Sequence, residues 1–241
     1  MGKVWAFVVR LAALALVLCA SGAAQKLPWH PRQGEALSGV NKVVLVSPTV
    51  HVEKWSARTG REAEGTADYV RRVICGSMDQ LLEERRVAVE DYPLCLGESE
   101  ASLDRRQALA AAGMHFRAMA NDWSTTHHTE QRLEAFRLGD ELAEIKKLEV
   151  DALILVDANG ILTTKGEKAL SAIGSLGGGP GQSLVLRIGV IRPQTGELVY
   201  FTEHGMGGDF VKNQDKLEGF IEKTMGSVFG RSASPQGESK P

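Results

Sequence analysis

The sequence lacks the residue patterns that mark the commonest catalytic and nucleotide-binding sites. No serine occupies the G-x-S-x-G pattern of many hydrolases, and no two histidines have the H-E-x-x-H spacing of zinc proteases. The glycine-rich segment Gly174–Gly181 continues with Gln182 and Ser183, whereas a phosphate-binding loop continues with Lys and Ser or Thr. We therefore expect no enzyme, no cofactor and no metal centre. The glycines are predicted to connect two strands, or to form a loop that contacts a partner.

The chain also has no surplus of positive charge. Its 28 Lys and Arg residues stand against 30 Asp and Glu residues, which gives a net charge of −2. A protein that binds nucleic acid usually carries a clear basic surplus, so this composition argues against a nucleic-acid partner. With 241 residues and 43% hydrophobic content, the chain is long enough for one well-buried domain.

The N-terminus has the pattern of an export signal. Lys3 and Arg10 flank the start of an apolar stretch, the segment Leu11–Cys19 is its short core, and the small residues Ala20–Ala24 follow. A positive start, a short apolar core and a small-residue exit are typical of a secretory signal. We expect signal peptidase to remove residues 1–24, so that the mature protein is periplasmic or secreted. An uncleaved anchor is the less favoured outcome.

Cys19 suggests a second way of processing the N-terminus. In lipoprotein signals a Cys follows a short apolar core, and a small residue precedes that Cys. Here Leu16, Val17 and Leu18 precede Cys19, and Leu18 is bulky where Gly, Ala or Ser is usual. Cys19 is therefore either an apolar residue of the signal or the lipid anchor of a lipoprotein, which would attach the protein to a membrane face.

Two further cysteines, Cys75 and Cys95, lie beyond the signal. An exported chain with two cysteines is expected to form one disulfide, and closing a loop of about 20 residues stabilises the fold by roughly 3 kcal/mol in the chain-entropy model. The alternative is a buried free thiol. Two thiols alone are too few for a structural zinc site, which takes four ligands.

Residues 42–229 carry the patterns of one folded domain, between a polar linker at 25–41 and a tail rich in Ser, Pro and Gly at 230–241. The elements follow the order β-α-β-α-α-β-β-β-α. We expect an α/β (α+β) domain whose mixed sheet is packed by helices, because both faces of the central strands need burial. The predicted strands are 43–52, 86–91, 151–157, 183–191 and 197–202. The predicted helices, in chain order, are 66–84, 102–120, 127–148 and 210–229.

Individual residues define several of these boundaries. Pro48 marks a bend or the end of the first strand, and Thr66 and Ser102 are each expected to cap a helix. Residues 58–65 are predicted to form a polar loop. The segment Pro193–Gly196 supplies the turn of an antiparallel strand pair.

Few polar residues are candidates for chemistry. Asp151 and Asp157 bracket an apolar strand, and polarity at the strand edges explains them. Together with Ser183 and His204 they would form a triad only if the fold brought them together. His127, His128 and Glu130 cluster at a predicted helix start, and His115 precedes them. The cluster is expected to be solvated, with weak metal binding as the alternative.

The tryptophans Trp29, Trp55 and Trp123 lie in polar, loop-like surroundings. Each is expected to cap the core from a loop. The alternative is that an exposed tryptophan contacts a partner, because exposed aromatic side chains often anchor protein interfaces.

Two short segments resemble a group of bacterial envelope domains. Asp151–Ile154 is similar to the D-x-A-L-I pattern of a strand in that group, without the spacer residue after Asp151. Thr195–Leu198 is similar to its hairpin pattern D-x-T-G-E-hydrophobic, with Arg192 and Pro193 where an Asp is frequent. The group comprises the TolB N-terminal-like domain, the curli secretion protein CsgG and the lipoprotein activators of penicillin-binding proteins. The resemblance covers residues 42–229 and implies non-enzymatic docking or assembly.

The sequence thus favours an exported envelope protein that acts as a binding or assembly accessory of another envelope protein. One alternative is a subunit of an oligomeric secretion pore like the curli channel. Such a pore needs extra amphipathic strands of about 9–11 residues, and no such pair is visible between the predicted elements. The other alternative is a hydrolase whose site no motif reveals.

Overall fold

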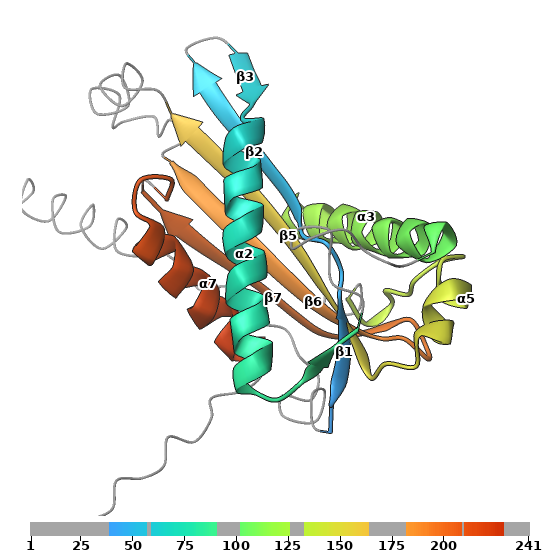
Figure 1. Ribbon diagram of the computed structural model, residues 1–241. Helices are drawn as coiled ribbons and strands as arrows, with labels where there is room; N and C mark the ends of the chain where they lie inside the picture. The colour runs from blue at the N-terminus through green and yellow to red at the C-terminus, as the bar shows by residue number, and fades with distance from the viewer. Residues whose placement is uncertain are drawn as a thin grey trace, which may run out of the picture.

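The structure, a computed structural model, describes residues 39–56, 59–90, 102–125, 133–163, 182–208 and 210–228. They form one mixed sheet with helices on both faces, which confirms the expected α+β class (Figure 1). The strands are β1 (Lys42–Leu45), β2 (Thr49–Ser56), β3 (Thr59–Glu62), β4 (Ala88–Val89), β5 (Ala152–Thr163), β6 (Ser183–Arg192) and β7 (Glu197–Gly207). The helical elements are α2 (Glu64–Glu84), α3 (Leu103–Thr125), α5 (Leu142–Ile145), the 3-10 turn η1 (Lys146–Leu148) and α7 (Gln214–Val228).

Strand β5 is the centre of the sheet. Along one edge its first half pairs in parallel with β1 and its second half with β2, so the predicted first strand is interrupted at Pro48 as expected. Along the other edge β5 pairs antiparallel with β6, and β6 pairs antiparallel with β7. β4 lies beside β1 in parallel, and β3 forms a hairpin with β2. The turn Pro193–Gly196 closes the β6–β7 pair as predicted, with Gly196 at φ +73°.

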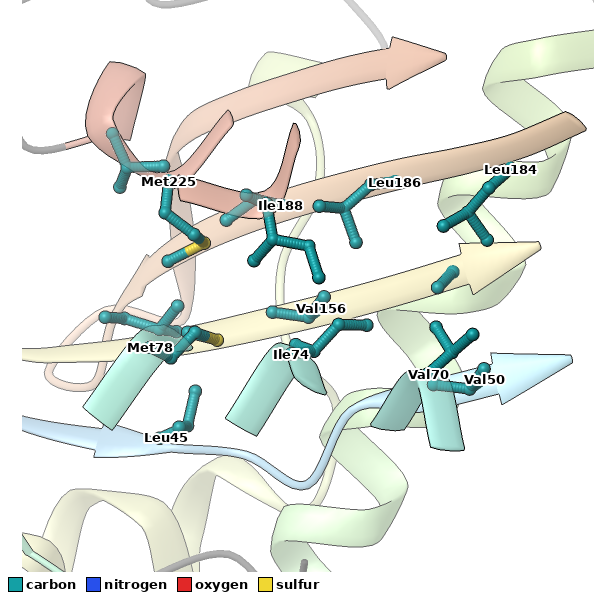
Figure 2. Close-up of a cluster of buried hydrophobic side chains, with 14 of the residues drawn as sticks. Leu45, Val50, Val70, Ile74, Met78, Val156, Leu184, Leu186, Ile188 and Met225 are labelled. Atoms are coloured by element: carbon teal, nitrogen blue, oxygen red, sulfur yellow. The ribbon is translucent and has the colours of Figure 1, made fainter. Parts of the chain in front are cut away.

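One face of the sheet packs against α2 and α7. Side chains from alternate positions of β5 and β6 meet the apolar stripes of both helices in a continuous buried cluster (Figure 2). Ile74 and Met78 of α2 and Met225 of α7 are fully buried there. The buried residues of these two helices recur at three- and four-residue spacing in the sequence, which is the spacing of one helix face.

The other face packs against α3 and α5. Phe116 of α3 lies directly on Gly189 of β6 and makes an edge-to-face contact with Phe201 of β7, with 6.1 Å between ring centroids. Three residues earlier in α3, Gly113 lies close to Val46 and Thr49 on the opposite side of β5. The helix therefore crosses the strands and covers only a band of this face, as Figure 1 shows.

The predicted helix 127–148 is wrong in its extent. Residues 126–132 lie outside the described residues. Beyond them Leu133 and Glu134 are helical, but the helix ends there, and helical structure resumes only at α5 and η1. The reason is tertiary: the backbone N–H of Leu138 donates to the Gly196 carbonyl at 3.1 Å, and Arg137 forms an isolated bridge with Glu197. The segment is therefore held against the β6–β7 turn in a conformation that an uninterrupted helix cannot adopt.

Smaller corrections concern the ends of other elements. The expected loop at 58–65 contains strand β3, whose four residues have no apolar alternation, and α2 begins at Glu64, so Thr66 lies inside the helix. Ser102 does cap α3, because its Oγ accepts from the Arg105 N–H at 3.3 Å, but α3 continues to Thr125 through the predicted break. None of the helices in the described ranges is long and apolar enough to cross a membrane.

The contact between Phe116 and Gly189 yields a first prediction. A Cβ added at Gly189 would lie 2.3 Å from the Phe116 ring, so Gly189→Ala forces the ring or the strand to move. We expect the free energy of unfolding in urea to fall by about 1–3 kcal/mol. Gly76→Ala is the control, since a Cβ at this position of α2 meets nothing within 4 Å; it should be neutral or slightly stabilising. Equal stability of the Gly189→Ala and wild-type proteins would contradict the packing.

Candidate binding site

A row of charged side chains crosses the α3-covered face of the sheet. Asp157 of β5, Arg187 of β6 and Glu203 of β7 are direct cross-strand neighbours. Residues that pair across adjacent strands point to the same face, so the three side chains lie side by side in one line. Asp157 is 0% exposed and Arg187 is 5% exposed, which is unusual for charged residues and requires that they satisfy each other.

The guanidinium of Arg187 makes the contacts that join this row. Its Nη1 donates to Asp157 Oδ2 at 2.8 Å and to Asn121 Oδ1 at 2.9 Å, and its Nε donates to Glu203 Oε2 at 2.8 Å. Asn121 belongs to α3. One planar side chain therefore connects three strands and a helix, with the fork geometry that favours arginine over lysine.

Asp157 is surrounded by donors but is not fully satisfied. Its Oδ2 also accepts from Asn159 Nδ2 at 2.7 Å, and the Arg117 guanidinium lies 3.7 Å from Oδ1, which has no hydrogen-bond partner among the described residues. Burial raises the pKa of the Asp157 carboxyl, and the positive charges of Arg187 and Arg117 oppose that shift. The expectation that polarity at a strand edge explains Asp157 is wrong, because the residue lies in the middle of β5 and is completely buried.

The charged row marks a boundary on this face of the sheet. On one side of it, α3 and α5 cover a buried apolar cluster that includes Leu155, Ile191 and Phe201. On the other side, Asn159, Val185 and Gly205 are cross-strand neighbours that form the next line of residues on the same face. Asn159 and Val185 are only partly buried, and Gly205 is exposed. Their sequence neighbours on the α2 face, such as Ala158 and Leu186, are fully buried. Beyond the row, no described helix covers the sheet, and we call this region the open face.

Trp55 lies at the far end of the open face, where β2 pairs with β3. The tryptophan is 40% exposed, its Nε1 donates to Glu53 Oε2 at 2.8 Å, and its ring atoms lie 3.4 Å from the position of a Cβ on Gly60. His51 bridges Glu53 and Glu62 at 3.1 and 3.2 Å. The hydrogen bonds from His51 and Trp55 lower the pKa of Glu53. These contacts fix the orientation of the indole and leave part of it in contact with solvent.

The residues that the structure describes include one of the three cysteines. Cys75 is buried in α2 and is disulfide-bonded. Cys95 and Cys19 lie outside the described residues, so the Cys75–Cys95 bond and the lipid anchor stay predictions. The same holds for the Gly174–Gly181 loop and for Trp29.

The residues considered for a catalytic triad do not come together. Asp151 lies at the start of β5, where its Oδ2 accepts from the backbone N–H groups of Asn41 and Lys42. Ser183 lies at the opposite end of the sheet. Asp157 faces α3, whereas His204 alternates with Glu203 along β7 and therefore points to the other face. The fold thus gives this hydrolase arrangement no support.

His115 has a structural partner that the sequence did not indicate. Its Nδ1 lies 2.6 Å from Glu141 Oε1, and the same oxygen accepts from the Gly139 N–H at 3.1 Å. Burial alone would raise the pKa of Glu141, but its backbone hydrogen bonds and the His115 contact lower it overall. The pair fastens α3 to the segment before α5. His127, His128 and Glu130 lie outside the described residues.

Two other features of the described residues do not form convincing sites. No group of three His, Cys, Asp or Glu side chains is placed to hold a metal ion within those residues. An open groove of about 520 Å³ lies between α2 and α7, and its walls include Tyr69, Arg72, Glu218 and Glu222. Burial raises the pKa of Tyr69, helped by the negative charge of Glu218. The groove lacks the buried, convergent polar groups that characterise a ligand pocket.

The charged row yields a second prediction. Replacing Arg187 by Met leaves the Asp157 carboxylate buried without its main partner, and we expect a loss of about 3–5 kcal/mol in the free energy of unfolding. The double variant Asp157→Val/Arg187→Met removes both charges and should lose clearly less than Arg187→Met alone. Additive losses in this double-mutant cycle, measured by urea unfolding, would show that the pair is not coupled.

His204 yields a third prediction, on pH. Burial lowers its pKa, with the Lys223 charge adding to the shift, and its Nε2 has no hydrogen-bond partner in the described structure. The unfolded chain therefore binds a proton at higher pH than the folded one. Stability should fall as the pH drops below about 6.5, the ordinary His pKa. We expect His204→Leu to reduce this fall when unfolding is compared at pH 7.5 and at pH 5. An unchanged pH dependence would refute this role of His204.

Comparison with known proteins gives only distant structural similarity. No family model and no curated protein sequence matches the chain. The lipoprotein GNA1162 from Neisseria meningitidis is similar at 9% identity, over 80% of this chain and 99% of its own, with a TM-score of 0.34. The PelC dodecamer from Paraburkholderia phytofirmans is 8% identical over 80% of this chain and 90% of its own, with a TM-score of 0.37. The LpoB C-terminal domain from Salmonella enterica is 10% identical over 74% of this chain and 94% of its own, with a TM-score of 0.28. Similarity at this level assigns neither a family nor a function.

Proposed function

We propose that the chain is an exported protein of the bacterial cell envelope that binds another envelope protein on the open face of its sheet. The observation that carries the proposal is the change of burial across the row Asp157–Arg187–Glu203. On one side of the row the sheet is covered by its own helices, and on the other side it is partly exposed. A sheet with one polar, solvated face needs no partner, but this face also presents apolar and aromatic groups.

The composition of the open face is suited to a protein contact. Val185 and Ile161 supply apolar surface, and Asn159 and Ser183 supply polar groups, all of them partly buried. Protein interfaces combine apolar contact area with polar groups that form hydrogen bonds at about one per 100–200 Å². Trp55 adds an aromatic side chain whose orientation is fixed by Glu53, and ordered aromatic residues are frequent anchors of interfaces.

A role without chemistry is supported by how the charged groups are used. The Arg187 guanidinium contacts Asp157, Glu203 and Asn121, so its donors are engaged in holding α3 on the sheet. The acidic groups that it contacts are also buried, since Asp157 is 0% exposed and the Glu203 side chain is 9% exposed. These ion pairs position secondary-structure elements, which is a structural use of charge.

Export is supported by the sequence. The basic, apolar and small-residue pattern of residues 1–24 is that of a secretory signal, and disulfides such as the one at Cys75 persist in oxidising compartments. The resemblance of Asp151–Ile154 and Thr195–Leu198 to bacterial envelope domains agrees with that location. Within this proposal Cys95 is the partner of Cys75, and Cys19 is either removed with the signal or lipidated.

Placing a charge on the open face tests the proposal. Val185→Lys introduces an ammonium group in the middle of that face, and we expect recovery of the bound protein from an envelope extract to fall by roughly tenfold or more. Val73→Lys is the matched control, since Val73 is also partly buried but lies on α2, on the opposite side of the sheet. Both variants are checked by thermal unfolding.

Two results of this recovery experiment would contradict the proposal. If Val185→Lys recovers the same protein as wild type in the same amount, the open face is not the binding surface. If only Val73→Lys loses the partner, binding occurs on the helical side.

A further inference from the structure

The β2–β3 hairpin has an acidic face and a basic face. Its cross-strand pairs are Glu53 with Glu62 and Lys54 with Arg61. Successive residues of a strand point to opposite faces, so both glutamates lie on one side of the hairpin and both basic residues on the other. The hairpin forms the outermost part of the sheet, above the first turn of α2 in Figure 1. Each side is therefore accessible to another molecule.

Like charges that oppose each other across two strands are destabilising. On the acidic face His51 reduces the repulsion, because it lies between Glu53 and Glu62 with one ring nitrogen near each carboxylate. On the basic face Lys54 and Arg61 are both exposed, and neither forms an ion pair with another described residue. Among the residues that the structure describes, the basic pair of the hairpin therefore has no compensating charge.

We propose that a second copy of this chain supplies that charge. The basic face of one hairpin, Lys54 and Arg61, docks on the acidic face of the next, Glu53 and Glu62. Each face carries two residues of one sign, at positions set by the same strand register, so the two faces match in number and spacing. The acidic face is the outer end of the open face, because Glu53 pairs with Ile161. The inference nevertheless goes beyond the proposed function, because its partner is a copy of the same chain and the contact also uses the basic side of the hairpin.

Trp55 adds contact area to this surface. It lies on the acidic face beside Glu53, and its ring is 40% exposed. A guanidinium or ammonium group that approaches the two carboxylates would also pass over the indole, and cation–π contacts favour this arrangement. Arg61 and Lys54 of the arriving copy are such groups. The aromatic ring therefore strengthens the preference of this face for a basic partner surface.

The contact joins two different surfaces, so it is head to tail. After one contact forms, each copy still has one unused face, and association continues until a ring closes or a filament grows. Because the charges are exposed, screening by salt should weaken the contact. Self-association that disappears at high ionic strength is therefore the expected behaviour of the purified chain.

A charge exchange between the two faces tests the proposal. Glu53→Lys/Glu62→Lys makes both faces basic, and Lys54→Glu/Arg61→Glu makes both faces acidic. In sedimentation velocity at low salt, wild type should form oligomers and each double variant should be monomeric. An equimolar mixture of the two variants should associate again, because each variant offers the face that the other needs. Asp140→Lys/Glu149→Lys, at exposed positions near α5, is the control and should behave as wild type.

Three results would overturn the proposal. The first is a wild-type protein that is monomeric at low salt over the accessible concentration range. The second is oligomers that persist in both hairpin variants, and the third is two monomeric variants that do not associate when mixed. Each variant must first show the circular dichroism and melting behaviour of a folded protein. Because this experiment contains only copies of the chain, its failure leaves binding of another protein at Val185 unaffected.

Discussion

The arrangement of this protein depends on the buried guanidinium of Arg187. Its hydrogen bonds reach β5, β7 and α3 from a position in the middle of β6. No apolar side chain could join these elements with the same directionality, because an arginine fork presents donors at fixed angles. The position of α3 on the sheet follows from these hydrogen bonds and from the close packing of Phe116 on Gly189. Arg187 and Gly189 lie two residues apart on β6, and together they define where α3 crosses this strand.

The charged row contributes more to the positions of the helix and strands than to the free energy of folding. Burying charged groups costs desolvation free energy that their mutual attraction only partly offsets, in agreement with the raised pKa of Asp157. Its consequence is the division of one sheet face into a covered half and an open half. Because α3 crosses the strands whereas α2 follows the sheet toward β3, the two faces differ in coverage (Figure 1). The proposed binding surface exists because of that difference.

Sequence reasoning found the elements that are defined locally and missed those defined by tertiary contacts. The apolar run of β5, the strands of β6 and β7 and the stripes of α2 and α7 follow from periodicity alone. The 127–148 helix failed because Leu138 hydrogen-bonds to a turn far along the chain. The charged row was also missed, since the pairing of Asp157 with Arg187 depends on strand register. One signal was present: an arginine inside the apolar run Leu184–Ile191 needs a buried partner.

Hydroxyl-radical footprinting of the purified chain can measure whether the α3-covered side of the sheet is divided into a buried half and an open half. At low protein concentration and high salt, Trp55, Ile161 and Val185 on the open face should be oxidised rapidly. Leu155 and Phe201, under α3, should be strongly protected. Equal protection of both groups would show that another part of the chain covers the open face, and that this half of the sheet is not available to a partner.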